Sequence, residues 1–237
     1  MIYIGTAGWS IPKELREYFG EGGDLLQRYA TRLNVTEINR TFYAMPRAST
    51  FQKWAAETPE EFRFTLKLPR LYTHFKKLGT TEGLEEFCST ISHLGAKLLA
   101  ILVQLPPSLR YEQERAEAFF SKLTTLCACA IACEPRHESW IEAEALFQKL
   151  GIARVAADPP RFEIDKEPGG YEGFRYYRLH GSPKIYYSSY SEEFLQELAA
   201  KLRKDKASTQ IVIFDNTASG AAFSNALRLK ELVDETQ

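Results

Sequence analysis

The stretch LLAILVQL at Leu98–Leu105 is an almost unbroken apolar run of strand length. Strands of a parallel sheet that helices cover on both faces have this composition, because neither face meets water. A helical stretch follows at Glu112–Leu126, and a second short apolar strand follows that helix at Ala130–Glu134. A strand, a helix and a strand in this order predict two parallel strands joined by a right-handed crossover.

The same alternation extends to both ends of the chain. We expect eight strands, at Ile2–Gly5, Val35–Asn39, Phe62–Leu68, Leu98–Leu105, Ala130–Glu134, Ala153–Ala157, Phe174–His180 and Gln210–Phe214. Helices are predicted at 24–33, 48–57, 82–94, 112–126, 140–150, 191–203 and 219–233. An open doubly wound sheet would alternate too, but eight units of similar size favour closure. We therefore predict an α/β fold: a single (β/α)8 TIM-type barrel domain over 1–237, with a loop or degenerate helix after strand six, at 158–173.

The overall charge excludes some functions. The 237 residues carry a net charge of −1 and a pI of about 6.5, so no global field attracts the protein to nucleic acid or to anionic membrane. The N-terminus enters a strand directly, without the pattern of a signal peptide, and no stretch has the length of a membrane span. We expect a cytoplasmic protein with no membrane partner.

The chain has four cysteines, Cys88, Cys127, Cys129 and Cys133. None has the paired C-x-x-C spacing of a zinc site. A soft-metal or redox cluster is one interpretation of the three that lie close together. We favour the other, which is four reduced, mostly buried side chains in a reducing compartment.

Polar side chains gather at the predicted strand ends, where a TIM-type barrel places its site. Residues two apart on a strand share a face, so Glu134 and Arg136 point the same way, as do Arg178 and His180. The other strands and the loops just beyond them contribute Trp9, Glu37, Asn39, Tyr43, Lys67, His74, Gln104, His137, Asp215 and Asn216. Carboxylates and cations in similar numbers are expected to converge on one mouth.

Burying these groups unpaired would cost several kcal/mol, so they must pair with one another, be hydrated or bind a ligand. One interpretation is a self-satisfied network of ion pairs that closes the top of the barrel. We favour a functional site, because barrel enzymes place their working groups there. A metal cluster of His74, Glu134, His180 and Asp215 is conceivable, but no H-x-H or H-E-x-x-H spacing supports it. We predict no metal and no cofactor.

Two segments that include opposite strands of the ring and the loops after them, 63–77 and 174–190, combine cations with aromatic side chains and contain no acid. Cations bind phosphate or carboxylate, and aromatic rings stack on a base or a sugar. Such runs are often only solvated loops. Their shared position at the mouth favours an anionic ligand.

Seven motifs resemble domain of unknown function family 72, in the same order and over nearly the whole chain. They are Ile4–Ser10, Glu37–Tyr43, Lys67 with Thr73-His74, Gln104–Pro107, Glu134–Trp140, Tyr177–Gly181 and Phe214–Thr217. The resemblance implies a TIM-type barrel and no particular reaction. The family's barrel is similar in shape to metal-dependent apurinic endonucleases and sugar isomerases, but this sequence lacks the many histidines and acids of those metal sites. It also has Asp215 where many members have asparagine, and Arg40 where many have a small residue.

Two functions follow as hypotheses. The first is a hydrolase or lyase acting on a phosphate- or carboxylate-bearing substrate, which Lys67, Arg136 and Arg178 would hold. Glu134, with Glu37 or Asp215, would then be general acid and base, and His180 the proton carrier. The second is a binding protein without chemistry, which grips a nucleotide or single-stranded nucleic acid on its tyrosines.

Overall fold

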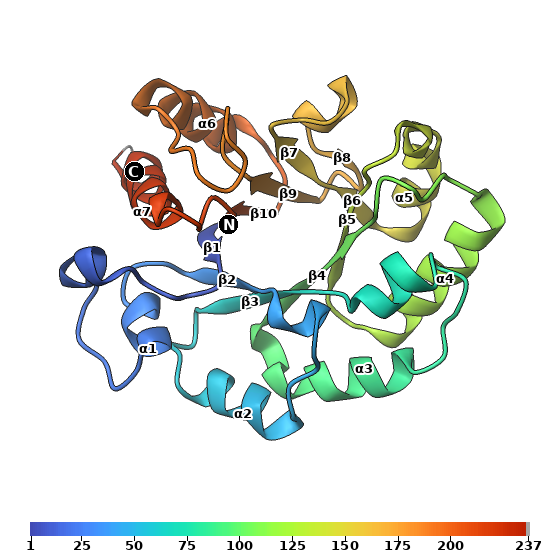
Figure 1. The fold of residues 1–237 in the computed structure, drawn as a ribbon, viewed down its shortest axis with the longest axis horizontal. Coiled ribbons are helices and arrows are strands. Elements are labelled where there is room, and N and C mark those ends of the chain that lie inside the picture. The colour runs from blue at the N-terminus through green and yellow to red at the C-terminus, as the bar shows by residue number, and fades with distance from the viewer. Residues whose placement is uncertain (236–237) are drawn as a thin grey trace.

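The computed structural model describes residues 1–235, in which one sheet of ten strands is surrounded by helices (Figure 1). The strands are β1 Ile2–Ala7, β2 Val35–Ile38, β3 Arg63–Lys67, β4 Leu98–Gln104, β5 Ala130–Glu134, β6 Ile152–Arg154, β7 Ala156–Asp158, β8 Gly169–Gly170, β9 Phe174–Leu179 and β10 Thr209–Phe214. The α-helices are α1 Leu25–Ala30, α2 Ala48–Ala56, α3 Leu84–Ile91, α4 Gln113–Leu126, α5 Glu144–Leu150, α6 Glu192–Lys204 and α7 Ala221–Asp234. Short 3-10 helices lie at Lys13–Tyr18, Arg40–Phe42, Ser92–Lys97, Glu138–Ala143 and Glu163–Lys166, and a π-helical turn lies at Leu71–Phe75.

The strands form a nearly closed cylinder. β6 pairs with β5, and β7 pairs with β9, so the two halves of the sixth predicted strand join the two sides of the ring. Between them the order is β9, β10, β1, β2, β3, β4 and β5, with parallel pairing at every step. Leaving out antiparallel β8 and counting β6 and β7 as one, the ten strands of residues 1–235 reduce to eight. The predicted TIM-type barrel is confirmed.

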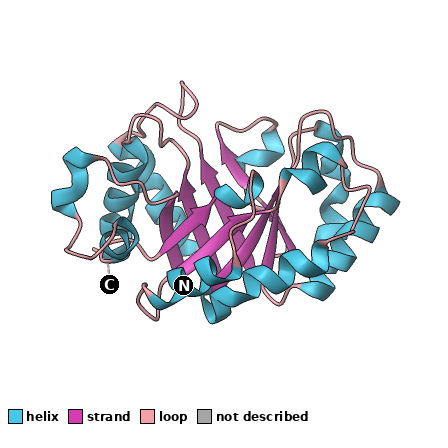
Figure 2. Ribbon diagram, turned by 60° about the horizontal axis from the view of Figure 1, so that its bottom comes forward, coloured by secondary structure: helices cyan, strands magenta, loops and turns pink. Residues whose placement is uncertain are grey.

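The core has two layers, because successive side chains of a strand point to opposite faces. On β9, Phe174 and Tyr176 belong to the cluster inside the barrel, whereas Tyr177 and Leu179 belong to the layer between strands and helices. Figure 2 shows the strands in the middle with helices on either side. The helices cover the outer layer with one apolar stripe each, and α6 buries Leu195, Leu198, Ala199 and Leu202.

Local signals explain where helices begin and end. Asp24 precedes α1 and its side chain accepts the Gln27 N–H at 2.9 Å, which satisfies one of the free donors of the first turn. Ser191 precedes α6 and accepts the Phe194 N–H at 3.3 Å. Gly151 ends α5 with φ at 69°, a left-handed conformation that favours glycine.

The segment after the sixth strand departs from the regular pattern. The strand expected at Ala153–Ala157 is interrupted at Val155, because its two halves pair with different neighbours. No α-helix follows it before β9 within the described residues. Buried Arg154 explains this, since it points outward and donates to Glu144 Oε2 at 3.0 Å and to the carbonyl of Ile164 at 2.5 Å. These contacts hold the 3-10 helix Glu163–Lys166 against the barrel where a helix would otherwise pack.

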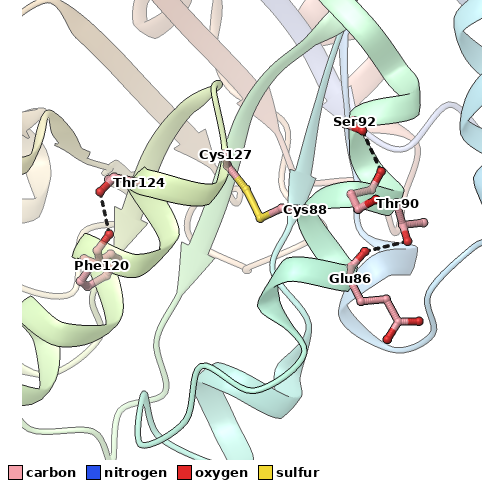
Figure 3. Close-up of a disulfide and its surroundings, with 8 residues drawn as sticks. Glu86, Cys88, Thr90, Ser92, Phe120, Thr124 and Cys127 are labelled. Atoms are coloured by element: carbon pink, nitrogen blue, oxygen red, sulfur yellow. Dashed lines mark hydrogen bonds between the residues drawn. A yellow bond between two sulfur atoms is a disulfide. The ribbon is translucent and has the colours of Figure 1, made fainter.

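The cysteines also depart from expectation. Cys88 on α3 and Cys127 just after α4 form a disulfide, so the prediction of four reduced cysteines is wrong for this pair (Figure 3). Cys129 and Cys133 are free. The pair is 39 residues apart in sequence and 5.8 Å apart between Cα atoms, a proximity that linear spacing does not reveal. Disulfides persist in oxidising compartments, so these cysteines do not support the expected cytoplasmic location.

No helix within residues 1–235 combines the length and apolar character needed to cross a bilayer.

Candidate functional site

One column of side chains runs up the inside of β9 and changes character along its length. Phe174 and Tyr176 lie in the buried interior cluster, Arg178 lies one step higher, and His180 follows the last residue of the strand. Because alternate residues share a face, one strand contributes two aromatic rings and then two basic groups. The polar cluster therefore lies on apolar layers, at the carboxyl ends of the strands.

Arg178 is the centre of this cluster and is only 1% exposed. Its Nε and Nη2 donate to the two oxygens of Glu37 at 3.1 and 2.7 Å. Nη1 donates to Glu134 Oε2 at 2.8 Å, and Nη2 also donates to Asp215 Oδ2 at 3.0 Å. A planar guanidinium suits this arrangement, because its donors can reach several carboxylates in one plane. One cation thus joins acids from β2, β5 and the end of β10.

Glu37 lies at the bottom of the cluster and is 0% exposed. Besides Arg178, its Oε2 accepts the hydroxyl of Tyr176 at 2.8 Å, and that hydroxyl lies 2.9 Å from Thr65 Oγ1. A carboxylate covered in this way has no open side for a ligand. Its contacts instead fix the position of the guanidinium above it.

His180 lies between two carboxylates at the top of the cluster. Its Nδ1 is 3.0 Å from Asp215 Oδ2, and its Nε2 is 3.1 Å from Glu134 Oε1. Arg136 Nη2 donates to the same Glu134 oxygen at 2.8 Å. Ionised carboxylates only accept hydrogen bonds, so an imidazolium, with a proton on each nitrogen, satisfies both neighbours at once.

The charges of the cluster shift the pKa values of its members in opposite directions. Burial alone would raise the pKa of Glu134, but the charges of Arg178 and Arg136 and the His180 hydrogen bond hold it well below its usual range. Asp215 is similar: Arg178 and His180 outweigh its burial and lower its pKa. For His180, burial favours the neutral ring, but the hydrogen bonds to Asp215 and Glu134 raise its pKa. These surroundings thus favour ionised acids on both sides of a protonated histidine.

A second line of contacts leads from Glu134 across the mouth. Gln104 Nε2 donates to Glu134 Oε2 at 3.0 Å, and Gln104 Oε1 accepts from Lys67 Nζ at 2.5 Å. The Lys67 ammonium lies 4.1 Å above the centre of the Phe42 ring. The ring of His74 meets the same phenylalanine edge to face, at 5.0 Å between centroids. Lys67, Gln104 and Glu134 are the last residues of three neighbouring strands, which explains why they meet.

The basic groups on this side have lowered pKa values. Burial and the charge of Arg178 lower the pKa of Lys67 to about 8. Burial and the charge of Lys67 lower the pKa of His74. This side of the mouth therefore favours neutral bases, whereas the His180 side favours an ionised histidine.

A cavity of about 580 Å³ opens beside the cluster. Its wall includes Glu134, Arg136 and His180 from the cluster, and it is completed by Pro135, Ala157, Pro159, Pro160, Arg161, Asp165, Ile185 and Tyr186. The volume is within the range of small-ligand sites. Two guanidinium groups and an imidazole thus border one hollow at the carboxyl ends of the strands.

The structure brings together eight of the predicted site residues in one network of contacts: Glu37, Lys67, Gln104, Glu134, Arg136, Arg178, His180 and Asp215. The roles assigned to them stay predictions. Tyr43 and His74 lie on the neighbouring Phe42, and Asn39 directly precedes the short helix that carries it.

Three predicted site residues make their contacts away from the cluster around Arg178. Trp9 packs edge to face on Trp54, with 5.1 Å between centroids. His137 Nδ1 lies 2.9 Å from Ser139 Oγ and borders a separate hollow. Asn216 is fully buried and donates to the carbonyl of Ser188, so it holds the loop after β9 in place.

The two basic and aromatic segments only partly reach the mouth. Arg63 and Arg175 lie at the beginnings of β3 and β9, and Arg175 pairs with Asp205 at 3.2 Å. The two segments were expected to face each other across the mouth, and these two arginines do not contribute to it. Arg70, beyond the end of β3, does lie among exposed rings, 5.4 Å from the centre of Tyr43 and 5.2 Å from that of Phe75.

Sequence reasoning missed two residues of the cluster's surroundings. Tyr176 was expected on the rim but lies inside the barrel, and its two-residue spacing from Arg178 is the signal that places it there. Arg161 borders the cavity from the irregular segment after β7, where no periodic pattern exists to orient a side chain.

The fold and the cluster define a parallel barrel with one concentrated set of buried charges at the carboxyl ends of its strands. The family model described as "Protein of unknown function DUF72" matches residues 3–237, so the chain belongs to this family. The family resemblance inferred from the sequence motifs is thereby confirmed.

Relatives and solved structures agree with this assignment. The chain is 24% identical to the UPF0759 protein YunF of Bacillus subtilis over 268 residues, covering 99% of this chain and 95% of YunF. A crystal structure of a DUF72 family protein from Thermotoga maritima is similar with a TM-score of 0.78 and 28% identity, covering 99% of both chains.

A higher identity is confined to part of the chain. The UPF0759 protein YecE of Escherichia coli K12 is 36% identical over 107 residues, which are 45% of this chain and 38% of YecE. The match thus spans well under half the length of that relative. A putative vitamin-B12 independent methionine synthase from Listeria monocytogenes, with a TM-score of 0.56 and 10% identity, shares the fold alone.

Proposed function

We propose that the protein is an enzyme, of hydrolase or lyase type, that acts on a small phosphate- or carboxylate-bearing substrate at the carboxyl end of the barrel. One observation carries the proposal: His180, held between two acids, borders a cavity that Arg136 and Arg161 also border. A structural ion-pair network would not need a hollow beside its most polar members. A site that binds an anion and transfers a proton needs both the polar cluster and a cavity beside it.

The residues take distinct roles in this proposal. Arg136 and Arg161 bind the anionic group, because guanidinium groups match phosphate and carboxylate with two parallel donors. Asp215 holds the His180 ring through Nδ1, and His180 donates to the leaving oxygen the Nε2 proton that Glu134 Oε1 otherwise accepts. Glu134 accepts a proton or steadies the histidine from the other side. Arg178 and Glu37, which are buried below, are positioning residues, since neither is exposed to the cavity.

Thermal unfolding with inorganic phosphate tests the binding step, since a ligand of the native state raises the melting temperature. We expect phosphate to stabilise the wild type and to lose this effect in Arg136→Met. Arg175→Met is the matched control, because Arg175 pairs with Asp205 and does not border the cavity. An equal response in Arg136→Met would remove the basis of the proposal.

Turnover tests the chemical step. Release of phosphate from a panel of sugar phosphates and nucleoside monophosphates should fall about 100-fold or more in His180→Gln, since a positioned acid contributes roughly 10² to 10⁴ in rate. Circular dichroism of the variant confirms that it is folded. Turnover that is unchanged in His180→Gln contradicts the role given to this histidine.

A second function is supported by a separate observation. Tyr43 and Phe75 are 68% and 64% exposed with Arg70 between them, and Tyr186 and Tyr187 are exposed after β9, on the opposite wall of the ring. Exposed rings beside cations serve as stacking platforms for single-stranded nucleic acid.

Fluorescence titration with an oligothymidylate distinguishes the enzyme from the nucleic-acid-binding protein. Binding that is lost in Phe75→Ala but kept in Glu134→Gln favours a binding protein without chemistry.

A further inference from the structure

Lys67 differs from the other cations of the cluster in lacking an acid partner. Arg178 pairs with three carboxylates and Arg136 with one, whereas Lys67 takes part in no ion pair within residues 1–235. Its Nζ donates to the neutral amide of Gln104 and otherwise lies above the ring of Phe42. An ammonium in these surroundings has lost much of its water, and the carboxylates of Glu134, Glu37 and Asp215 stabilise it only from beyond direct contact.

The backbone holds Lys67 at the edge of the mouth. It is the last residue of β3, and its carbonyl accepts the hydroxyl of Thr41 at 2.7 Å. Thr65, two residues earlier, contacts Tyr176 inside the barrel, so the Lys67 side chain also points inward. Unlike Thr65, which is fully buried, Lys67 is partly exposed. The amine is therefore fixed in position and reachable from the open end.

The same surroundings favour the free amine. Burial and the charge of Arg178 lower the pKa of Lys67 to about 8. At pH 7 roughly one tenth of the side chain is then unprotonated, which is far more than for an ordinary lysine. Amines that are desolvated beside another cation are those that proteins use as nucleophiles toward carbonyl groups.

We propose that Lys67 is a nucleophile that forms an imine with the aldehyde or ketone group of an anionic substrate. The inference rests on the proposed function and narrows it to a lyase acting on a carbonyl compound that bears phosphate or carboxylate. Lys67 is linked through Gln104 to Glu134, which borders the cavity and pairs with Arg136, so we place the anion on Arg136 and the carbonyl toward Lys67.

The steps balance without a further reactant. The Lys67 ammonium first gives a proton to water, which its lowered pKa of about 8 favours. The free amine then forms a C–N bond as the C=O π bond breaks, and the oxygen takes up a proton. The hydroxyl leaves as water after a second protonation, which gives the iminium. In a β-hydroxy carbonyl substrate, the bond between the carbon next to the iminium and the hydroxyl-bearing carbon then breaks, and its electron pair converts the iminium into an enamine. The departing fragment leaves as an aldehyde after its hydroxyl gives a proton to water. Protonation of the enamine carbon restores the iminium, and addition of water releases the second product and returns the Lys67 amine.

Trapping with a reducing agent tests the inference. The full chain is incubated with glyoxylate or with dihydroxyacetone phosphate and sodium cyanoborohydride, and the modified lysine is located by peptide mass mapping. We expect the adduct at Lys67 at least tenfold above that at any other lysine. Its rate of formation should level off above about pH 8, whereas ordinary surface lysines react faster up to higher pH.

Matched variants separate this lysine from a merely buried one. Lys67→Arg and Lys67→Met should abolish the adduct, and Lys67→Met keeps the apolar stem above Phe42 if the arginine variant fails to fold. Lys97→Arg is the control, because Lys97 also has a lowered pKa but bonds to the carbonyls of Ala55 and Thr58, before β4 begins. It should leave the adduct unchanged.

The outcomes distinguish this inference from the function on which it rests. Adducts spread evenly over surface lysines, or none at Lys67 with either probe, overturn the imine. If inorganic phosphate still stabilises the wild type but not Arg136→Met, the anion site stands while the imine is lost. An adduct at Lys67 without any effect of phosphate supports the nucleophile and contradicts the anion site.

Discussion

The two ends of the barrel are built on different physical principles. At the end where strands begin, the interior is filled by apolar and aromatic side chains such as Tyr3, Phe174 and Ile211, and a disulfide ties two helical segments together outside it. At the end where strands finish, the interior is filled by charges centred on Arg178. Apolar packing stabilises by burial alone, whereas buried charges depend on every partner being present.

This difference indicates which parts of a barrel can tolerate amino-acid substitutions. Apolar layers accept substitutions that preserve volume, because no single contact is obligatory. In the charged layer, removing one group leaves the others buried without compensation, and this cost exceeds the net gain from the intact pair. Such a layer contributes little to stability, and its position beside a cavity supports the functional role proposed for it.

The largest expected effect is the loss of Arg178. Arg178→Met leaves three carboxylates without their shared cation, so we expect the free energy of unfolding to fall by about 3–5 kcal/mol in urea titrations. Arg175→Met, on the outside of the same strand, should cost about 1 kcal/mol or less. Adding Glu37→Gln to Arg178→Met should recover part of the loss. Equal costs for the two arginines would abolish the contrast between the layers.

Reduction of the disulfide tests the opposite end. Opening Cys88–Cys127, which are separated by 39 residues, should lower the free energy of unfolding by about 2–4 kcal/mol, because the unfolded chain regains freedom. The measurement compares urea unfolding with and without dithiothreitol. A Cys88→Ala/Cys127→Ala double variant keeps both free cysteines and should no longer respond to the reductant. A response that survives in this variant would show that the disulfide is not its source.

The hydroxyl of Tyr176 gives a smaller contrast at the boundary between layers. Tyr176→Phe removes the donor to Glu37 and the partner of Thr65, which should cost about 1–3 kcal/mol because buried polar atoms lose their partners. Tyr3 lies lower in the same interior, and within residues 1–235 its hydroxyl donates only to the Met1 sulfur, at 3.6 Å. Tyr3→Phe should therefore cost about a few tenths of a kcal/mol at most. Similar losses of unfolding free energy in the two variants would contradict a sharp boundary between the apolar and the charged layer.

The smallest effect is a pH dependence confined to the charged end. The raised pKa of His180 means that its stabilising contribution is complete below pH 6.5 and is lost as pH rises through the folded value. The lowered pKa values of Glu134 and Asp215 act in the other direction, and their contributions are lost as pH falls below about 4. The stability difference between wild type and His180→Asn should therefore shrink between pH 6 and pH 9. A difference that does not vary over this range would contradict the imidazolium.

Much of the fold could be predicted from the sequence because the same strand–helix unit repeats along the chain. The spacing of apolar residues indicates each strand or helix, and the run at Leu98–Leu105 indicated a strand whose two faces are both covered. The interruption at Val155 and the missing helix after it could not be predicted, because both depend on pairing with distant strands and on the contacts of Arg154. The disulfide could not be predicted for the same reason, because it joins two residues that are close in space but distant in sequence.

The candidate site could be predicted in its membership more than in its arrangement. The two-residue period correctly collected Glu134, Arg178 and His180, since strand ends of a barrel meet at one mouth. It could not show that Glu37 lies beneath Arg178, because depth within the barrel depends on the stagger of the strands. Nor could it show that Lys67 lacks an acid partner, which depends on competition among all the cations.

The depth of Arg178 has a consequence for how the chain is made. Glu37 and Glu134 precede their shared cation by 141 and 44 residues, so both acids leave the ribosome well before the group that neutralises them. A nascent chain that ends before β9 lacks Arg178, so burying Glu37 would leave its carboxylate without the cation that pairs with it in the folded protein. We therefore expect the charged end of the barrel to close only after β9 has been synthesised.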